Sequence, residues 1–213
     1  MATATKWSNI AIAVQSALAA ADTITGITKA NPGVATSTSH GISNGEIVLL
    51  SAQGMHQLDG RVVRAANVAA NTFELEGVDT TLFDTFTSGT AEVITFGTSL
   101  ATATSVSATG GDFDFVDVTT IHDNVKKQIP GLANPATFTF ENIWDVSDAG
   151  LVALKAASDS QAERAVRFTF ANGQKLYFNG YIGCTLLPTG NAQEVVKTSV
   201  VITMFGKPTV YSS

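Results

Sequence analysis

The sequence predicts a mainly β protein with one α-helix, organised as two β units. Short runs in which apolar and polar residues alternate are typical of strands with one buried face. Asn-Gly and Asp-Gly dipeptides separate several of these runs, as they do in tight turns between antiparallel strands. A single stretch has apolar residues at helical spacing behind good N-cap residues. The chain has 213 residues, which is enough for one large core or two small ones.

A first strand is predicted near the N-terminus, where Ile10, Ile12 and Val14 alternate with smaller or polar residues. We interpret this segment as mature structure rather than a secretory signal, because Asn9 and Gln15 interrupt its apolar run. The chain contains no stretch of about 20 apolar residues, so the sequence argues against a transmembrane helix.

Composition divides the chain into two parts. From residue 24 it shifts to Thr, Gly, Asn and small apolar residues, and near residue 95 it changes again. We expect an inserted module at 24–95, with residues 1–23 and 96–213 forming the main domain. Turn signals at Asn44-Gly45, Asp59-Gly60 and Ala70-Asn71 separate strand-like runs at 46–51, 61–68, 72–76 and 88–93. This spacing predicts a small barrel or sandwich. The module carries −4 of the total charge of −6.

Residues 96–111 are mainly Ser, Thr, Ala and Gly, which supply few large side chains to bury, so we expect a long, mobile loop there. The helix is predicted further on, with Asp145 or Ser147 as its N-cap. Apolar residues within 151–154 have helical spacing, and the pattern ends near Ser158.

The sequence pattern of the C-terminal part, from residue 166 onward, predicts strands. Alternation over 166–170, the dipeptide Asn172-Gly173 and the apolar run 175–178 together indicate a β-hairpin. A last strand over 195–205 is long enough to pair with several partners or to cross a subunit boundary.

Composition also limits the classes of partner. Charged residues make up 14% of the chain, against roughly 25% in ordinary soluble domains, and the mean hydropathy is +0.20. We therefore expect much of the surface to be buried against neighbours. The net charge of −6 argues against a nucleic-acid groove, and Lys126-Lys127 is too small a basic group to form one. The single cysteine, Cys184, excludes a disulfide framework and is expected to be buried and inert.

No catalytic, cofactor-binding or metal-binding residues are predicted, and we do not expect an enzyme. His40, His56 and His122 are not spaced as metal ligands, and His40 fits a turn. Neither a nucleophile elbow nor a Gly-rich nucleotide-binding motif occurs. A group of acidic residues near His122 could bind a hard cation, but it departs from the EF-hand pattern, which favours a solvated acidic face. These residues are Asp112, Asp114, Asp117 and Asp123.

Three stretches carry a resemblance to a known family. They are FVDVTTIHDNVKKQIPGL at 115–132, FTFENIWDVSDAGLVAL at 138–154 and RFTFANGQKLYFNGYI at 167–182. These stretches contain, in order, a proline-glycine turn, a helix and a long C-terminal hairpin. In these features the chain resembles the major tail tube proteins of long, non-contractile-tailed bacteriophages of the siphovirus type. Together with residues 6–20, the resemblance covers most of the chain outside the module.

The module resembles a second kind of domain. Its segment SHGISNGEIVLLSAQGMHQLDGRVVRAANVAANTFELEGVD, at 39–79, is similar to the first catalytic cysteine half-domain of ubiquitin-activating enzymes, a small β-domain that recurs in phage virion proteins. This likeness implies a fold and no ubiquitin chemistry, since the module contains no cysteine. We expect the module to lie on the outside of the assembly.

The tail tube resemblance implies a β-sandwich whose copies form hexameric rings that stack into a hollow tube. Double-stranded DNA would pass through the lumen without specific binding, and a tape measure protein, a tail terminator and tip proteins would be partners in the virion. An acidic bore would repel phosphate. The acidic group near His122, the segment 96–111 and the last strand are candidates for contacts within or between rings, and we expect 96–111 to order against the next ring.

Two alternatives fit the same features. Another ring-forming tail component, such as a terminator or a contractile-tail tube subunit, would share the sandwich and the hexamer. An adhesion or carbohydrate-binding module would use aromatic platforms, for which Trp7 and Trp144 are the tryptophans present. Stacked rings would distinguish a tube subunit from both.

Overall fold

The computed structural model describes residues 9–212 and has the mainly β fold with one α-helix that the sequence predicts. Lys6 and Trp7 lie outside the described residues. The strands are β1 (Ala11–Leu18), β2 (Asp22–Ile24), β3 (Gly26–Ile27), β4 (Val34–Thr36), β5 (Ile47–Gln53), β6 (Val62–Ala69), β7 (Thr72–Leu75), β8 (Ser88–Leu100), β9 (Ala103–Thr109), β10 (Phe113–Asp117), β11 (Gln128–Ala133), β12 (Thr137–Ile143), β13 (Glu163–Thr169), β14 (Lys175–Cys184) and β15 (Lys197–Tyr211). The helices are the 3-10 helix η1 (His56–Leu58) and α1 (Ala149–Asp159).

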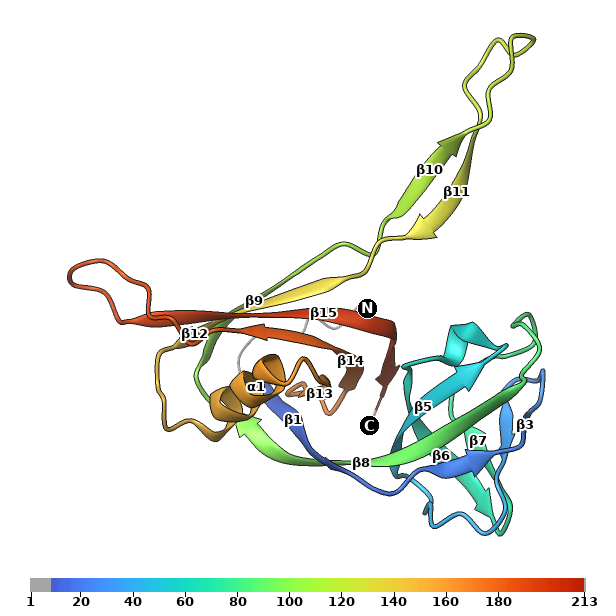
Figure 1. Cartoon of the computed structure of the whole chain (residues 1–213), viewed down its shortest axis with the longest axis horizontal. Helices are drawn as coiled ribbons and strands as arrows, with labels where there is room; N and C mark the ends of the chain where they lie inside the picture. The colour runs from blue at the N-terminus through green and yellow to red at the C-terminus, as the bar shows by residue number, and fades with distance from the viewer. Residues whose placement is uncertain (1–8, 213) are drawn as a thin grey trace.

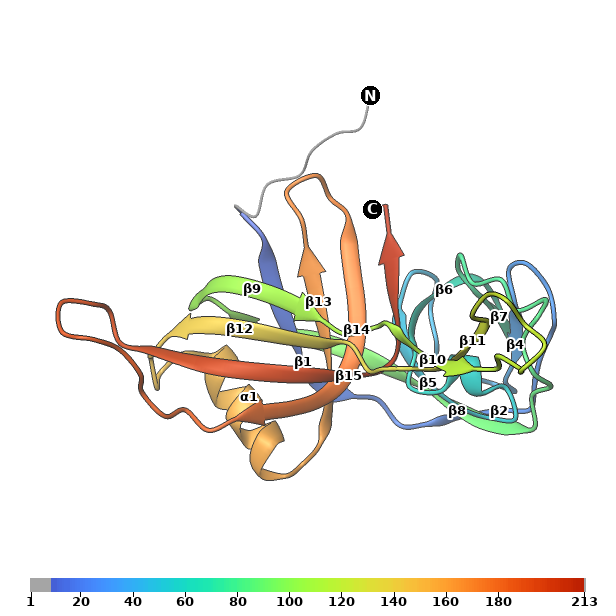
Figure 2. The same cartoon turned by 90° about the horizontal axis from the view of Figure 1, so that it is seen from above.

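A single antiparallel 13-stranded sheet runs through the molecule and curls around two cores (Figures 1 and 2). Its strand order is β3-β4-β7-β6-β5-β8-β1-β13-β14-β15-β12-β9, and β2 pairs with β8 beside this path. Strands β10 and β11 form a separate two-stranded sheet. The long sheet therefore has β9 as one of its edges.

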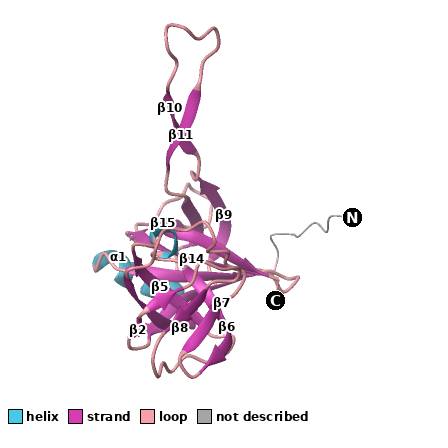
Figure 3. Cartoon of the chain, turned by 90° about the vertical axis from the view of Figure 1, so that its right-hand side faces the viewer, coloured by secondary structure: helices cyan, strands magenta, loops and turns pink. Residues whose placement is uncertain are grey.

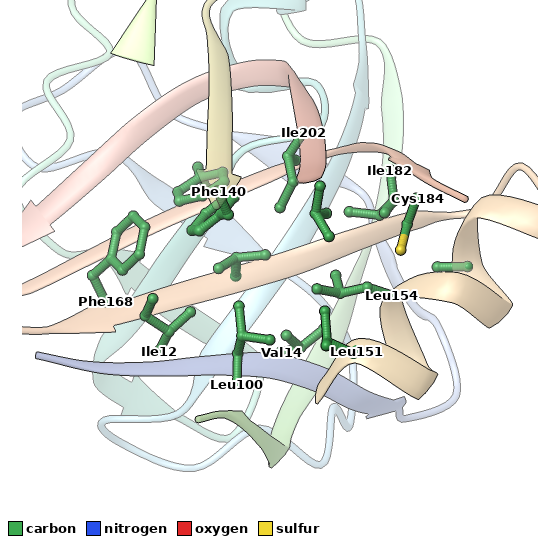
Figure 4. Close-up of a cluster of buried hydrophobic side chains, with 14 of the residues drawn as sticks. Ile12, Val14, Leu100, Phe140, Leu151, Leu154, Phe168, Ile182, Cys184 and Ile202 are labelled. Carbon is green, nitrogen blue, oxygen red and sulfur yellow. The ribbon is translucent and has the colours of Figure 1, made fainter. Parts of the chain in front are cut away.

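We call the part of the chain outside the module and its strands the body; it contains β1, the second half of β8, β9, β12–β15 and α1. The larger core lies between the curled strands of the body and α1 (Figure 4). Phe140, Phe168 and Phe178 are fully buried at its centre, and Leu151 and Leu154 project into it from the helix. Burial of each such side chain stabilises the fold by roughly 1.5–3 kcal/mol. The helix is therefore held to the sheet by its apolar face, as its sequence spacing predicts.

A second core is enclosed by β2–β7 and the first half of β8, and Phe73, Leu50 and Met55 are among its fully buried residues. The strands predicted at 46–51, 61–68, 72–76 and 88–93 are confirmed as β5, β6, β7 and the start of β8. Strand β8 continues without a break past residue 95, pairing with β5 through its first half and with β1 through its second. The two cores therefore share one strand.

A third, smaller cluster joins these two parts. Ile47 and Val62 pack with Tyr177 and Tyr211. The Tyr211 hydroxyl accepts a hydrogen bond from the Arg64 backbone N–H at 2.7 Å. The Arg64 guanidinium lies 4.5 Å from the centre of the Tyr211 ring. The C-terminal end of β15 is thus packed firmly against β6.

The prediction of a long, mobile loop at 96–111 is wrong, because most of this segment lies in β8 and β9. Its second half pairs along the whole of β12, with Val106 opposite Phe140. Only one face of β9 meets the core, where Val106 packs, so Ser and Thr suffice on the other face. Backbone pairing and β-branched residues order the segment without large side chains.

The helix begins later than its predicted caps. Asp148 is the N-cap, and its side chain accepts a hydrogen bond from the Leu151 N–H at 2.8 Å. Asp145 instead accepts bonds from the Ser147 N–H and hydroxyl in the preceding turn. The predicted caps Asp145 and Ser147 are therefore wrong, since they lie three positions and one position before the observed N-cap. The predicted end of the helix near Ser158 is confirmed within one residue.

The predicted hairpin is confirmed as β13 and β14, with Gly173 at φ +87° in the turn. The last strand is also confirmed and extends to Tyr211, beyond its predicted end. The prediction of a proline-glycine turn is wrong, because Pro130 and Gly131 lie within β11. A two-stranded sheet has an unpaired edge on each strand, which accommodates a proline that lacks a backbone donor.

Candidate functional site

The most conspicuous feature of the surface is a β-arm, defined as residues 112–134, that projects away from the body (Figures 1 and 3). Strands β10 and β11 pair over its first part, with Phe115 opposite Pro130 and Val116 opposite Ile129. At its root, the Asn134 N–H donates to the Asp112 carbonyl at 2.8 Å. The arm leaves the body between β9 and β12, at the edge of the long sheet.

The arm is apolar but has no core. Ile121 is 97% exposed, Leu132 87% and Phe115 63%. Five further large apolar side chains of the arm are exposed: Phe113, Val116, Val118, Val125 and Ile129. Exposed apolar surface of this extent marks an interaction site. A two-stranded ribbon is also only marginally stable alone, so packing against another surface would stabilise it.

The acidic group that the sequence singled out lies in this arm, where its carboxylates serve local turns. Asp117 accepts a hydrogen bond from the Thr119 N–H at 2.8 Å, and Asp123 accepts from Thr120 and pairs with Lys127. These hydrogen bonds lower the pKa of both carboxyl groups, with the Thr119 hydroxyl as the largest cause for Asp117 and Lys127 for Asp123.

The remaining members of the group lie nearer the root of the arm. Asp114 accepts a hydrogen bond from the Asn134 side chain at 3.1 Å, and the Asp112 backbone pairs with Asn134. His122 is exposed near the tip. Among residues 9–212, no three His, Cys, Asp or Glu side chains are grouped so as to hold a metal ion.

A groove of about 410 Å³ lies at the root of the arm, between its base and the bend in β15. Phe113 and Pro135 line one side, and Phe205 and Pro208 the other. Gly206 has φ +80° there, so β15 turns sharply toward the module at this point. The groove extends the apolar surface of the arm onto the body.

One face of the long sheet is lined by hydroxyl groups. The core-facing residues of β9, β12 and β15 alternate with residues that point outward, and pairing places the outward residues in rows. We define the hydroxyl face as Ser105, Ser107, Thr109, Thr137, Thr139, Ser199 and Thr203, all outward-facing. Glu141 lies among them, opposite Ser105 and Ser199. The same face also holds Val201, which is 37% exposed opposite Thr139, and the exposed Lys197 opposite Ile143 at its end.

A second apolar surface lies at the other end of the same strands. The Trp144 N–H donates to the Val196 carbonyl at 2.9 Å, and its indole N–H donates to the Leu186 carbonyl at 2.9 Å. These bonds gather exposed apolar residues from two loops. We define the tryptophan patch as Ile143, Trp144, Val146, Leu187, Val195 and Val196, which are 39% to 65% exposed.

The other candidate residues lie far from the arm. His40 packs edge-on against Phe73 in the module, and His56 opens η1, so the structure does not bring the histidines together. Cys184 is 2% exposed, as expected, and burial raises the pKa of its thiol. No helix in the described part of the chain has the length and apolar character needed to cross a membrane.

Sequence reasoning missed the apolar residues of the arm and of the tryptophan patch. Phe113 and Phe115 alternate with Asp112 and Asp114, which is a strand pattern, but the aspartates of the segment were interpreted as a possible cation site or a solvated acidic face. The patch is assembled from residues about 40 to 50 positions apart, and no local pattern marks such a surface.

Comparison with known proteins identifies the family. Residues 53–213 match the family model described as phage tail tube protein, TTP. The match runs from the last residue of β5 to the C-terminus and includes the β-arm, the hydroxyl face and the tryptophan patch. No curated protein matches the chain. The chain therefore belongs to the phage tail tube protein family and is a structural component of the tail of a bacteriophage virion.

Proposed function

We propose that six copies of this chain form a ring, and that the rings stack into the hollow tail tube of a siphovirus-type phage through which DNA is delivered. Membership of the tail tube family supports assembly into a multimer. A charged fraction of 14% supports extensive burial against neighbouring copies. A tape measure protein and terminator or tip proteins would be the other partners, and no enzymatic activity is proposed.

The observation that carries this proposal is the β-arm. Its large apolar side chains find no partner surface within the described chain, where Ile121 and Leu132 are almost fully exposed. Covering one such side chain contributes roughly 1.5–3 kcal/mol. Repeated at each contact of a ring or stack, this burial favours assembly.

The hydroxyl face is the surface that we propose lines the bore. Ser and Thr hydroxyls carry no net charge, so a face built from them neither binds phosphate tightly nor repels it strongly. Glu141 would add one negative charge per copy, and Lys197 at the end of the same face would add one positive charge, so the face has little net charge to attract phosphate. We therefore propose a bore lined mainly by hydroxyl groups, whereas the net charge alone led us to expect an acidic bore.

We propose that residues 24–95 form an inserted domain on the outside of the tube, with the fold of the first catalytic cysteine half-domain of ubiquitin-activating enzymes. A separate apolar core supports this assignment. The module also holds most of the net negative charge, which suits a surface that remains in solvent.

Negative-stain electron microscopy at low and high protein concentration tests the proposal. The full chain should form hollow tubes with six-fold end views. Replacing residues 113–133 by two glycines should abolish tubes, because the contact side chains are lost. The hydrogen bonds between Gly111, Asp112 and Asn134 close the root of the arm, so the shortened chain should keep the circular dichroism spectrum of a folded β protein.

Two results would contradict the proposal. Normal tubes from the shortened chain would exclude the arm as the assembly element. A full chain that stays monomeric at every concentration, and also after addition of tail tip complexes as an initiator, would exclude the tube function itself.

A further inference from the structure

Three Asn-Gly dipeptides occur in the chain, and each lies in a different structural environment. Asn44-Gly45 and Asn172-Gly173 lie in turns, as the sequence predicts, while Asn179-Gly180 lies inside β14. The dipeptide matters chemically because glycine has no side chain to shield its backbone nitrogen from the amide of the preceding asparagine. The environment of each dipeptide decides whether that nitrogen and that amide can react with each other.

The Asn44 side chain is unrestrained. The residue is exposed in the turn before β5. Among residues 9–212, no hydrogen bond or ion pair engages its side chain. Gly45 has φ +88°, and a Cβ there would meet no atom within 4 Å outside its chain neighbours. Neither side-chain hydrogen bonds nor crowding therefore hold the Asn44 amide away from the Gly45 nitrogen.

Asn172 has the same neighbour in sequence, but its side chain is held at both ends. The Gln174 N–H donates to the Asn172 side-chain oxygen at 3.1 Å. The Asn172 side-chain nitrogen in turn donates to the Gln174 side-chain oxygen at 2.9 Å. Both hydrogen bonds must break before the Asn172 amide carbon can approach the Gly173 nitrogen, so both raise the barrier to reaction.

Asn179 is restrained by burial as well as by hydrogen bonding. It is 1% exposed, and its side-chain nitrogen donates to the Glu163 carboxylate. Its backbone is paired with β13 on one side and with β15 on the other. Two paired neighbours keep the Gly180 nitrogen in the extended geometry of the sheet, and burial keeps water away from the amide.

The glycine N–H groups do not distinguish the two turns. The Gly45 N–H donates to the Ala65 carbonyl at 2.8 Å. The Gly173 N–H donates to the Phe170 carbonyl at 2.9 Å. Each nitrogen must leave one backbone hydrogen bond of similar length before it reacts. The side-chain hydrogen bonds of Asn172 are therefore the difference that remains between the turns.

We infer that Asn44 is a site of spontaneous covalent modification, at which the side-chain amide is lost through a cyclic succinimide. The Gly45 nitrogen bonds to the Asn44 Cγ, and the side-chain nitrogen leaves as ammonia with the proton of the Gly45 N–H. One water molecule then opens the ring at either carbonyl carbon, adding a hydroxyl to that carbon and a proton to the ring nitrogen. The product is aspartate or isoaspartate at position 44, and water is the only co-reactant.

The modification would change the start of β5. Either product places a negative charge close to Glu46, whose carboxylate accepts a hydrogen bond from the Ser43 N–H at 2.7 Å. Isoaspartate also adds one methylene to the main chain directly before the hydrogen bond between Gly45 and Ala65. Ile47 begins β5 two residues later and packs in the cluster that joins module and body. The modified turn should therefore loosen the end of the β5–β6 pairing.

Ageing of the purified full chain at mildly alkaline pH, followed by peptide mapping with mass spectrometry, tests this inference. Conversion at Asn44 should be about tenfold faster than at Asn172, since Asn172 must first break two hydrogen bonds. Asn179 should remain unconverted. Asn44→Gln should remove the fast conversion, because the longer side chain must close a larger ring.

The same chain unfolded in denaturant is the matched control. Without structure, Asn44 and Asn172 keep only their shared glycine neighbour, and the difference between their rates should disappear. A difference that persists after unfolding would assign the selectivity to the sequence rather than to the fold.

Two further results would overturn the inference. Equal or faster conversion of Asn172 in the folded chain would show that its side-chain hydrogen bonds do not protect it. No conversion of Asn44 in the folded chain, over a time in which the unfolded chain converts, would show that the hydrogen bond from Gly45 to Ala65 protects the turn. None of these outcomes depends on tube formation, so the proposed function is tested separately.

Discussion

At the scale of single residues, Arg64, Glu76 and Tyr211 form a polar cluster in the contact between the module and the body. Arg64 pairs with Glu76 and stacks on Tyr211, whose hydroxyl donates to the Glu76 carbonyl at 3.3 Å. The hydrogen bond from Arg64 lowers the pKa of the Glu76 carboxyl below its ordinary value of 4.5. Protonation in acid therefore weakens this contact.

The Glu76→Gln substitution tests this pH dependence. A carboxyl whose pKa is lowered by folding adds stability that is present above pH 4.5 and is lost as pH falls through the folded pKa. We expect E76Q to reduce the free energy of unfolding by at most about 1 kcal/mol at neutral pH, since the pair is partly exposed. The difference should vanish in acid. Denaturant unfolding at several pH values measures it, and a constant difference across this range would contradict the assignment.

At the scale of elements, the start of α1 depends on the side chain of Asp148, whereas the sequence predicted Asp145 or Ser147 as the N-cap. The Asp148 carboxylate caps the Leu151 N–H and also accepts a hydrogen bond from the Ala101 N–H at 3.3 Å. We expect Asp148→Ala to lower the free energy of unfolding by about 1 kcal/mol. Asp145→Ala, the matched control, should cost less, because Asp145 serves only an exposed turn. Equal losses would show that the helix is not capped by Asp148.

The elements that the sequence predicted well share a local cause. The hairpin of β13 and β14 and the strands of the module are specified by alternation and by turn dipeptides within a few residues. The segment 96–111 failed because its order comes from pairing with β1 and with β12, the latter some 30 positions away. The carboxylates of Asp117 and Asp123 satisfy nearby backbone and hydroxyl groups, which residue type alone does not reveal.

Local sequence patterns also did not predict the candidate contact surfaces. The apolar residues of the arm follow a pattern that would indicate a core, but the described chain leaves them exposed. The tryptophan patch depends on the bonds of Trp144 to two carbonyls far along the sequence. Resemblance to a family supplied the function, while the fold was needed to locate both surfaces.

At the scale of the whole molecule, the shared strand β8 and the cluster around Tyr211 fix the module to the body. A module attached by flexible linkers would move independently, whereas this one shares a continuous sheet with the body. A Cβ at Gly60 would lie 2.2 Å from the Phe205 ring, so module and β15 are in close contact there as well. The module should therefore keep a fixed orientation on each subunit of a tube.

The Tyr211→Ala substitution tests this coupling. Tyr211 is 6% exposed, and removal of a buried aromatic side chain costs roughly 3–5 kcal/mol. Because the lost contacts join β6 to β15, hydrogen exchange should quicken in the module strands while the core around Phe140 and Phe178 stays protected. Val210→Ala is the control, since the side chain of Val210, next to Tyr211 in the sequence, is 62% exposed. If both variants left exchange in β6 unchanged, the module would be held by β8 alone and its orientation would not depend on the C-terminal strand.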